Sequence, residues 1–281
     1  MGNSGQSKPA AAAFDLSFVM AQLRECAQAS ELFSHPKQEF VVLLNTGAFC
    51  PPHRGHASMM AAALAHLGEQ RSNVHVLGGL MTPTHQRYVD KKCADKHCTS
   101  LRGSDRLYML QMTIANEPSL HCGRNFYACP YELELPQPVE FWHVSLALKE
   151  ALIREIAFYQ GEHKDWIQSQ VDRIRVYYVC GMDHAKKCNL LEPGAFSMFE
   201  RKWTDALVVV GRTVADVDRD QLTSTNPDYV HLVHSPAETD VASTLIREHM
   251  IDGTLDKVAH MLAPEVVSYI SAKHLRIHKA P

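Results

Sequence analysis

The 281-residue chain has no run of about 18 unbroken apolar residues, the length that a membrane-spanning helix requires. It also lacks a strong excess of either charge, since 28 Lys and Arg stand against 31 Asp and Glu, a net charge of −3. These absences argue against a membrane partner and against a long nucleic-acid partner. Any phosphate chemistry must therefore depend on local groups.

The sequence also lacks a Cys-x-x-Cys pair, a His-Glu-x-x-His segment and an apolar signal segment ahead of its cysteines. The eight cysteines are therefore expected to be free thiols in a reducing compartment, the cytoplasm or the nucleus. One stretch imitates metal-ligand spacing, with Cys93, His97, Cys98, His121 and Cys122. Without a compact ligand pair, we expect no metal to be held by protein side chains alone.

No stretch rich in Pro, Gly or Ser divides the chain, and no internal repeat is present. We therefore expect a disordered tail at residues 1–13 and a single domain over residues 14–281. The last part of this domain, about residues 241–281, has helical patterns only.

Five short runs, continuously apolar and rich in β-branched residues, predict strands covered on both faces, at residues 40–44, 74–80, 174–180, 206–210 and 229–233. Helical patterns occupy residues 14–29, 56–68, 104–116, 139–160, 241–250, 254–260 and 264–274. This alternation predicts an α/β fold, a Rossmann-like doubly wound parallel sheet with helices on both faces. Loops that follow the strands are the best candidates for a site.

The segment Gly-Ala-Phe-Cys-Pro-Pro-His-Arg-Gly-His, residues 47–56, follows the first predicted strand directly. Gly47 permits a close approach of another backbone or a nucleotide, and the two prolines stiffen the turn. His53 and His56 lie three residues apart at a helix start, so both can face one side, beside the free N–H groups of the helix. The arrangement favours a polyphosphate site, although either histidine could instead cap the helix or bind a metal.

Two later segments add polar groups after strands or at a helix start. Ser243 and Thr244 precede an apolar helix that carries Arg247 on its first turn, a combination suited to phosphate. Gly181 and Asp183 end a strand, where a carboxylate can accept hydrogen bonds from ribose hydroxyls. The alternatives are a plain helix cap with a surface arginine for the first segment, and a helix cap for Asp183.

Together these segments resemble the motifs of the nucleotidylyltransferase superfamily: His-x-Gly-His at residues 53–56, Gly-x-Asp at residues 181–183 and Ser-Thr-x-x-Arg at residues 243–247. The order and spacing are most similar to the eukaryotic nicotinamide or nicotinate mononucleotide adenylyltransferases, over roughly residues 40 to 276. A lysine loop of the kind found in class I aminoacyl-tRNA synthetases is missing. Ala48 and Cys50 depart from the Gly-Ser-Phe-Asn-Pro pattern of the family.

The resemblance implies a division of roles. His53, His56 and Arg247 would be catalytic, and the nucleotide would be bound by Gly47, Ala48, Phe49, Gly181, Asp183, Ser243 and Thr244. The mononucleotide would be bound by residues chosen from Tyr88, Lys91, Lys92, Phe126, Tyr127, Phe196, Arg212 and His234. Tyr131, Glu132, Trp142 and Ser145 occupy positions that match a further motif of the family.

The activity that the resemblance implies is adenylyl transfer from ATP to nicotinamide mononucleotide, or to its nicotinate form, giving NAD and pyrophosphate with Mg²⁺ bound to the ATP. The alternatives are another adenylyl- or cytidylyltransferase of the superfamily and a non-catalytic, chaperone-like nucleotide-binding protein. The sequence leaves open whether the protein forms homo-oligomers.

Overall fold

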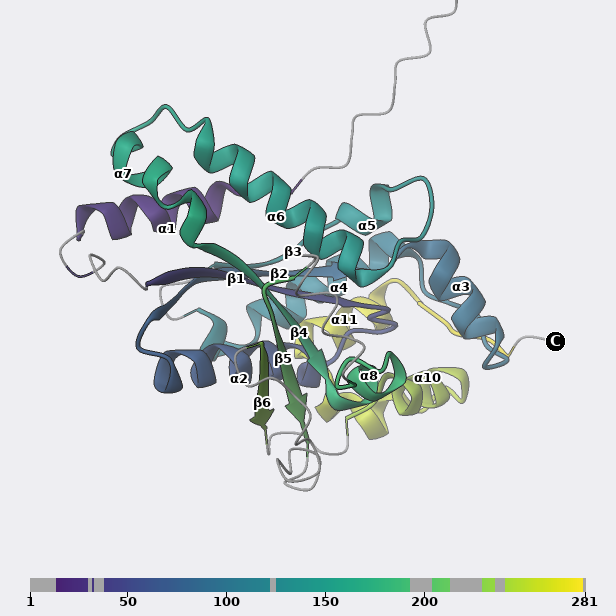
Figure 1. The fold of residues 1–281 in the computed structure, drawn as a ribbon. Helices are drawn as coiled ribbons and strands as arrows, with labels where there is room; N and C mark the ends of the chain where they lie inside the picture. The colour runs from purple at the N-terminus through teal and green to yellow at the C-terminus, as the bar shows by residue number, and fades with distance from the viewer. Residues whose placement is uncertain are drawn as a thin grey trace, which may run out of the picture.

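The computed structural model describes residues 14–29, 32, 38–121, 125–192, 204–212, 229–235 and 241–279. Six parallel strands form one sheet in the order β3-β2-β1-β4-β5-β6 (Figure 1). Their bounds are β1 Glu39–Gly47, β2 Val74–Pro83, β3 Asn125–Ala128, β4 Ile174–Gly181, β5 Ala206–Gly211 and β6 Val230–His234. The predicted Rossmann-like α/β fold is confirmed, with β3 as a strand that the sequence pattern did not predict. The expected tail, residues 1–13, lies outside the described residues.

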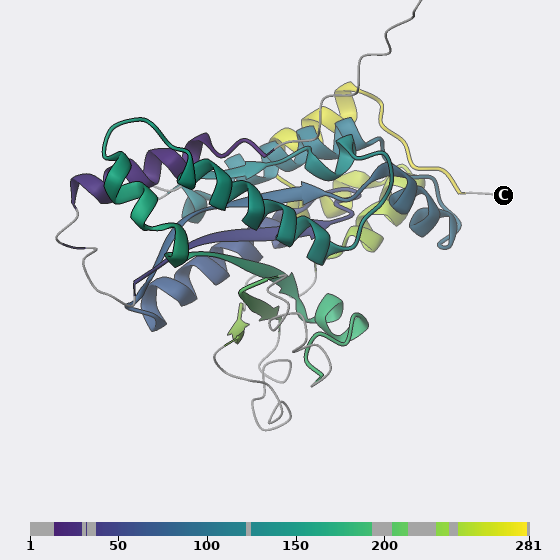
Figure 2. The ribbon, with the colours of Figure 1, turned by 45° about the horizontal axis from the view of Figure 1, so that its top comes forward.

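Helices cover both faces of the sheet (Figures 1 and 2). One face packs against α1 (Ser17–Gln28), α6 (Phe141–Ala157) and α7 (Lys164–Ser169), and the other packs against α2 (Arg54–Gln70) and α4 (Gly103–Ala115). Successive apolar residues of a strand point to opposite faces, so a continuously apolar strand such as β1 supplies both layers of core.

A third apolar cluster lies beyond the carboxyl ends of β1 and β2. It is formed by α3 (Gln86–Ala94), α10 (Ser243–Ile251), the 3₁₀ segment η7 (Leu255–Met261) and α11 (Pro264–Ala272), together with one side of α4. The helices predicted for residues 241–274 are therefore confirmed, with η7 a 3₁₀ turn rather than an α-helix. This cluster places the far end of the chain against the loop that follows β1.

Shorter elements connect these layers. They are η2 (Pro118–Leu120), α5 (Tyr131–Glu134), η3 (Val171–Arg173) and α8 (Met182–Lys187). Within the part of the chain that the structure describes, no helix combines the length and apolarity needed to cross a membrane.

The edge strand β3 depends on a glycine in its neighbour. Gly78 has a φ of +151°, and a Cβ there would lie 2.3 Å from the carbonyl oxygen of Asn125. Only glycine tolerates both this conformation and this approach. The register between β1 and β2 shifts by one residue at the same level, between Val41 and Val42.

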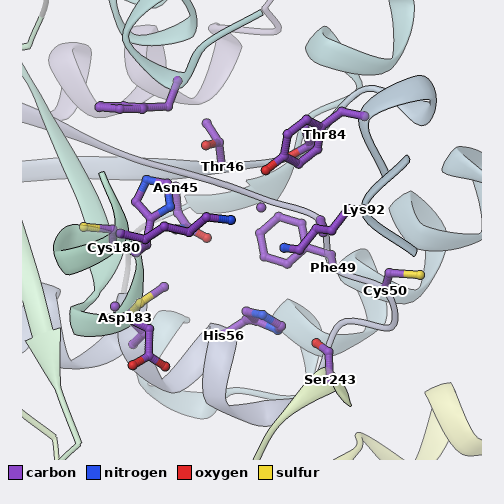
Figure 3. A pocket seen from close by; sticks show the side chains of 18 of the residues that line it. Asn45, Thr46, Phe49, Cys50, His56, Thr84, Lys92, Cys180, Asp183 and Ser243 are labelled. Atoms are coloured by element: carbon purple, nitrogen blue, oxygen red, sulfur yellow. The ribbon is translucent and has the colours of Figure 1, made fainter. Parts of the chain in front are cut away.

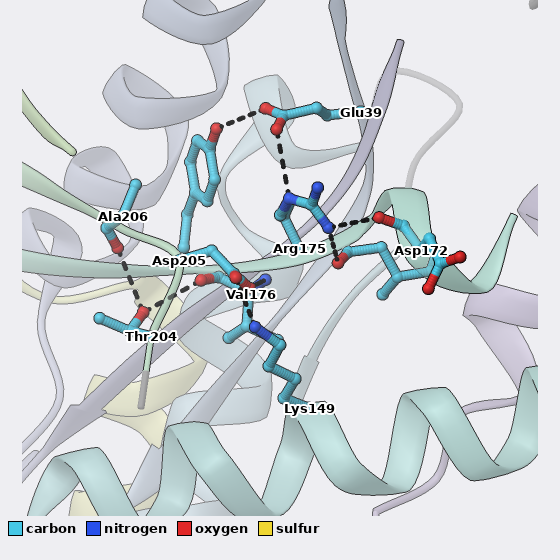
Figure 4. Close-up of polar contacts among 10 residues, drawn as sticks. Glu39, Lys149, Asp172, Arg175, Val176, Thr204, Asp205 and Ala206 are labelled. Carbon is cyan, nitrogen blue, oxygen red and sulfur yellow. Dashed lines mark hydrogen bonds and ion pairs between the residues drawn. The ribbon is translucent and has the colours of Figure 1, made fainter. Parts of the chain in front are cut away.

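Polar pairs join the strands at their amino-terminal ends, away from the loops that follow β1 and β2 (Figure 4). Arg175 Nε lies 3.2 Å from Glu39 Oε1, which ties β4 to β1. Asp205 accepts a hydrogen bond from the backbone N–H of Val176 at 2.8 Å and pairs with Lys149 of α6. These two ion pairs therefore lie far from the carboxyl ends of the strands.

The order in which strands are added to the sheet reverses between β1 and β4, since β2 and β3 lie on one side of this pair and β5 and β6 on the other. Loops leaving two such neighbouring strands diverge and leave a crevice at their carboxyl ends. The segment at residues 47–56 leaves β1 at this point, and Gly181 ends β4 beside it.

Candidate functional site

A cavity of about 690 Å³ opens at the reversal point between β1 and β4 (Figure 3). It is lined by thirteen residues to which the sequence analysis assigned a catalytic or binding role: Gly47, Ala48, Phe49, His53, His56, Tyr88, Lys92, Gly181, Asp183, Arg212, Ser243, Thr244 and Arg247. These residues come from five separate parts of the chain. A volume of this size accommodates ligands of several rings and phosphates.

The loop after β1 forms the floor of the cavity. Phe49 adopts a positive φ of +43°, which turns the chain sharply, and its ring is buried against Gly47. A Cβ at Gly47 would lie 3.1 Å from that ring, closer than an ordinary contact, so glycine permits this close packing. The carbonyl of Gly47 accepts the N–H of Thr84 at 2.8 Å, which joins the loops that follow β1 and β2.

His53 and His56 face the cavity from the start of α2 as a stacked pair, with ring centroids 3.7 Å apart and planes inclined by 25°. The backbone N–H of His53 donates to His56 Nδ1 at 3.1 Å. In a neutral imidazole the other nitrogen then carries the proton. His56 therefore presents Nε2–H to the cavity as a hydrogen-bond donor.

Both histidines are neutral near pH 7. Desolvation of the deep ring, and then the positive charge of Arg212, lower the pKa of His56 to about 3. Burial, followed by the neighbouring His56 and Arg212, holds the pKa of His53 well below its usual value. His53 Nδ1 is buried and has no hydrogen-bond partner among the described residues.

Helix α10 contacts the loop after β1 across almost 200 residues of sequence. Ser243 Oγ donates to the carbonyl of Pro51 at 3.1 Å, and Arg247 Nη1 donates to the carbonyl of Cys50 at 2.8 Å. Arg247 Nη2 donates to Thr244 Oγ1 at 3.0 Å. We call His53, His56, Ser243, Thr244 and Arg247 the candidate anion site.

The structure bears out one alternative interpretation of these segments, since His53 is the N-cap of α2 and its N–H donates to His56 in a capping box, and it overturns two others. Arg247 is only 7% exposed, so it is not a surface arginine, and the N-cap of α10 is Ala242 rather than Ser243. No side chain caps α8, so Asp183 does not serve as a helix cap and its carboxylate lines the cavity instead.

Positive charge dominates the cavity wall. Five cations line it, namely Lys92, Lys96, Lys187, Arg212 and Arg247. Among the described residues, none of these five makes an ion pair with a carboxylate. Burial, and then the charges of Lys187 and Lys96, lower the pKa of Lys92. An excess of close, unpaired cations favours binding of a multiply charged anion.

Another part of the cavity wall is aromatic. Phe141, at the start of α6, stacks on Tyr178 with centroids 4.5 Å apart, and His184 meets its edge at 5.6 Å. The hydroxyls of Thr46 and Tyr178 lie 2.9 Å apart. The cavity therefore combines a cationic part with a part suited to a flat ring.

Four predicted contacts do not line the cavity. Phe126 is buried in β3 against Gly79, and Tyr127 is exposed on the outer face of β3 beside Phe18. These positions do not fit the expectation that they flank a nicotinamide ring. Lys91 points to solvent, so the choice between Lys91 and Lys92 falls on Lys92, and His234 is exposed at the end of β6. Phe196 lies outside the described residues.

Sequence reasoning missed several lining residues. Phe141, Asn45, Thr46, Thr84 and Lys96 belong to this group. Asn45 and Thr46 follow the predicted end of the first strand, so their position beside Gly47 is a signal that could have found them. Phe141 precedes Val144, Ser145 and Leu148 at helical spacing, a periodicity that turns it toward the sheet.

Glu132 adds a buried carboxyl to the wall. Thr82 Oγ1 donates to its Oε1 at 3.2 Å, and burial raises the pKa of Glu132 to about 8, although Thr82 and Arg106 act in the opposite direction. Two other residues of the same predicted motif behave differently: Trp142 does not line the cavity, and Tyr131 stacks on Phe14. Glu132 is therefore largely protonated near pH 7 and can donate as well as accept.

We expect Glu132→Gln to change how stability depends on pH. The folded pKa of Glu132 lies above its unfolded value of 4.5, so the folded state binds the extra proton between pH 4.5 and about 8. The Glu132 contribution to stability is therefore lost as pH rises through this window. The melting temperature of Glu132→Gln should exceed that of the wild type by a few degrees at pH 8.5 and by less at pH 5.

Thermal unfolding at closely spaced pH values measures this difference. Glu134→Gln is the matched control, because Glu134 lies two residues away and is exposed. The melting temperature of Glu134→Gln should change with pH in the same way as that of the wild type. If the melting temperatures of Glu132→Gln and the wild type also changed with pH in the same way, the Glu132 carboxyl would be ionised in the folded protein near pH 7.

No family model matches this chain. A search among curated proteins found no match either.

Proposed function

We propose that the protein transfers the adenylyl group of ATP to nicotinamide mononucleotide, releasing pyrophosphate and forming NAD. One observation carries this proposal: the segment at residues 47–56 and helix α10, both singled out from the sequence as phosphate-binding, contact each other through Ser243 and Arg247. Gly181 and Asp183 line the same cavity from the end of β4. The proposal also rests on the resemblance of these segments to the nucleotidylyltransferase motifs.

The reaction needs no protein nucleophile. An oxygen of the 5′-phosphate of the mononucleotide forms a bond to the α-phosphorus of ATP, and the bond from that phosphorus to the bridging oxygen of pyrophosphate breaks. The attacking phosphate is already ionised near neutral pH, so no general base is required. Catalysis then consists of alignment and of stabilising the negative charge that moves toward the leaving group.

The candidate anion site supplies donors for this charge. His56 offers Nε2–H, Arg247 offers a planar guanidinium, and Thr244 offers a hydroxyl at the start of a nine-residue helix. The hydroxyl of Ser243 donates to the carbonyl of Pro51 and so holds the loop after β1 against this helix. Lys92, Lys187 and Arg212 add positive charge around the phosphates. Asp183 accepts hydrogen bonds from a ribose, and the surface of Phe141 accepts a flat ring.

The protein side chains fit a Mg²⁺ ion that arrives with ATP rather than one held by the protein alone. Among the described residues, no group of three or more His, Cys, Asp or Glu could hold a metal. Mg²⁺ commonly keeps several waters and binds through substrate phosphates and one or two carboxylates. When bound, it would neutralise part of the phosphate charge.

Product analysis tests the proposal. The purified chain is incubated with ATP, Mg²⁺ and either nicotinamide or nicotinate mononucleotide, and dinucleotide and pyrophosphate are measured over time. Equimolar formation of both products is expected, and kcat/KM for the two mononucleotides sets the preference. Other phosphorylated acceptors and CTP are tested in parallel. Absence of dinucleotide with both mononucleotides, while pyrophosphate appears with another acceptor, would assign a different transferase activity.

Arg247→Lys is expected to raise the KM for ATP about tenfold, since an ammonium cannot keep both hydrogen bonds of the guanidinium and still meet a phosphate. Arg102→Lys is the matched control because Arg102 is exposed and lies outside the cavity lining. Steady-state kinetics against ATP concentration measures the effect, with melting temperatures to verify folding. An unchanged KM and kcat in Arg247→Lys would remove Arg247 from the site.

A further inference from the structure

The chain just beyond helix α3 reaches the start of helix α10 at the exposed edge of the cavity. Lys96 Nζ donates to Thr244 Oγ1 at 3.4 Å, although the two residues lie 148 positions apart in sequence. Both side chains are exposed, and both line the cavity. Lys96 therefore adds a cation from α3 to the outer end of the candidate anion site.

Two cations donate to the same neutral hydroxyl. Arg247 Nη2 donates to Thr244 Oγ1 at 3.0 Å, alongside the ammonium of Lys96. A hydroxyl oxygen has two lone pairs, and when both accept a hydrogen bond its own O–H is left to act as a donor. Thr244 is thus fixed as a donor by its two neighbours, and all three side chains present N–H or O–H groups at this edge.

The positive charge around Lys96 is not balanced by nearby carboxylates. Burial, followed by the charges of Lys187, Lys96 and Arg247, lowers the pKa of Lys92, so these four cations lie close enough to repel one another. The ion pairs that the structure describes lie at the amino-terminal ends of the strands, away from this cluster. A bound polyanion would remove the repulsion, which favours a ligand with several phosphates.

Lys96 lies at the far end of the path that a bound nucleotide would take. Figure 3 shows Asp183 and Ser243 on opposite sides of His56. A nucleotide whose ribose contacts Asp183 and whose first phosphate meets His56 therefore extends toward the start of α10. Thr244 and Lys96 are exposed at that end, so the phosphate farthest from the ribose meets them. This direction rests on the proposed function.

We propose that Lys96 binds the terminal phosphate of a nucleoside triphosphate and so makes the protein select triphosphates over diphosphates. The ammonium exchanges a long contact with a neutral hydroxyl for a shorter, charge-assisted hydrogen bond to a phosphate oxygen. Thr244 keeps the hydrogen bond from Arg247 and donates its O–H to the same phosphate. A diphosphate ends one phosphate nearer the ribose, so Lys96 stays on Thr244.

Calorimetric titration of the full-length chain with ATP, ADP and AMP tests this inference. The titrations contain Mg²⁺, are made at constant ionic strength and include no mononucleotide acceptor. Lys96→Met is expected to raise the Kd for ATP about tenfold, the loss of one charged hydrogen bond, and to leave the Kd for ADP and for AMP within about twofold. Lys96→Arg should recover most of the affinity for ATP, because it keeps the charge and a donor.

Arg87→Met is the matched control, since Arg87 is an exposed cation of α3 that does not line the cavity. Its affinities for all three nucleotides should equal those of the wild type. Equal losses for ATP, ADP and AMP in Lys96→Met would show a general effect of charge and would overturn the inference. Unchanged ATP affinity in that variant, or no ATP binding by the wild type, would also overturn it. ATP binding without dinucleotide formation would instead contradict the proposed function alone.

Discussion

Replacement of His56 by alanine is expected to lower the rate of the proposed adenylyl transfer by about 10²- to 10³-fold, the usual cost of one donor that meets developing charge. The ring presents Nε2–H because Nδ1 accepts the N–H of His53. Its low pKa keeps it neutral near pH 7, so it would act as an oriented dipole rather than as a positive charge. Single-turnover measurements at saturating ATP report the chemical step.

His66→Ala separates a catalytic effect from a general effect on helix α2. His66 lies on the same helix, is partly buried and does not line the cavity. Its turnover should stay within about twofold of the wild type, and both variants should melt near the wild-type temperature. Equal turnover in His56→Ala and His66→Ala would remove His56 from the chemistry.

The fold was predictable where apolar pattern and element length agree. Five of the six strands, and helices α1, α2, α4, α6, α10 and α11, follow from runs and periodicities. The sequence pattern did not predict β3, because a strand of four residues is too short for a clear apolar pattern. Its close approach to β2 depends on Gly78. Helix α3 escaped because only Val89 and Cys93 are buried on it and its N-cap is His85, an uncommon capping residue.

The candidate site was predictable to the extent that it follows strand ends. Gly47, Gly181 and the two histidines stand where a doubly wound sheet places ligand contacts, and the cavity includes all of them. The proposed contact of Phe141 with a ligand ring was not predictable from aromatic residues near those strands. Phe126 covers a glycine within the sheet, whereas Phe141 reaches the cavity only because α6 lies across β4.

Arg106 is a buried cation that local sequence reasoning assigned to no role, since a polar residue on a helix is usually exposed. It is 0% exposed, and its Nη1 donates to the carbonyl of Ala48 at 2.8 Å. Its Nη2 donates to the carbonyl of Thr84 at 2.9 Å, and its Nε donates to that of Leu101 at 3.3 Å. One side chain thus holds together the loops after β1, β2 and α3.

Arg106→Met is therefore expected to destabilise the protein by about 3 to 5 kcal/mol, because it leaves buried carbonyls without donors. The loss corresponds to a fall of roughly 10 °C in melting temperature for a chain of this size. Urea unfolding followed by circular dichroism measures the change in free energy. Arg106→Lys should recover part of the loss, since one ammonium can reach some of the same oxygens.

Arg175→Met is the matched control, because Arg175 pairs with a carboxylate yet is about one-third exposed. Exposed ion pairs contribute roughly 0 to 1 kcal/mol, so this variant should unfold close to the wild type. The comparison sets an arginine that has an ionic partner against one that has only neutral acceptors. If Arg106→Met were as stable as Arg175→Met, the three loops would be held by apolar packing alone, and the geometry of the cavity floor would not depend on the guanidinium.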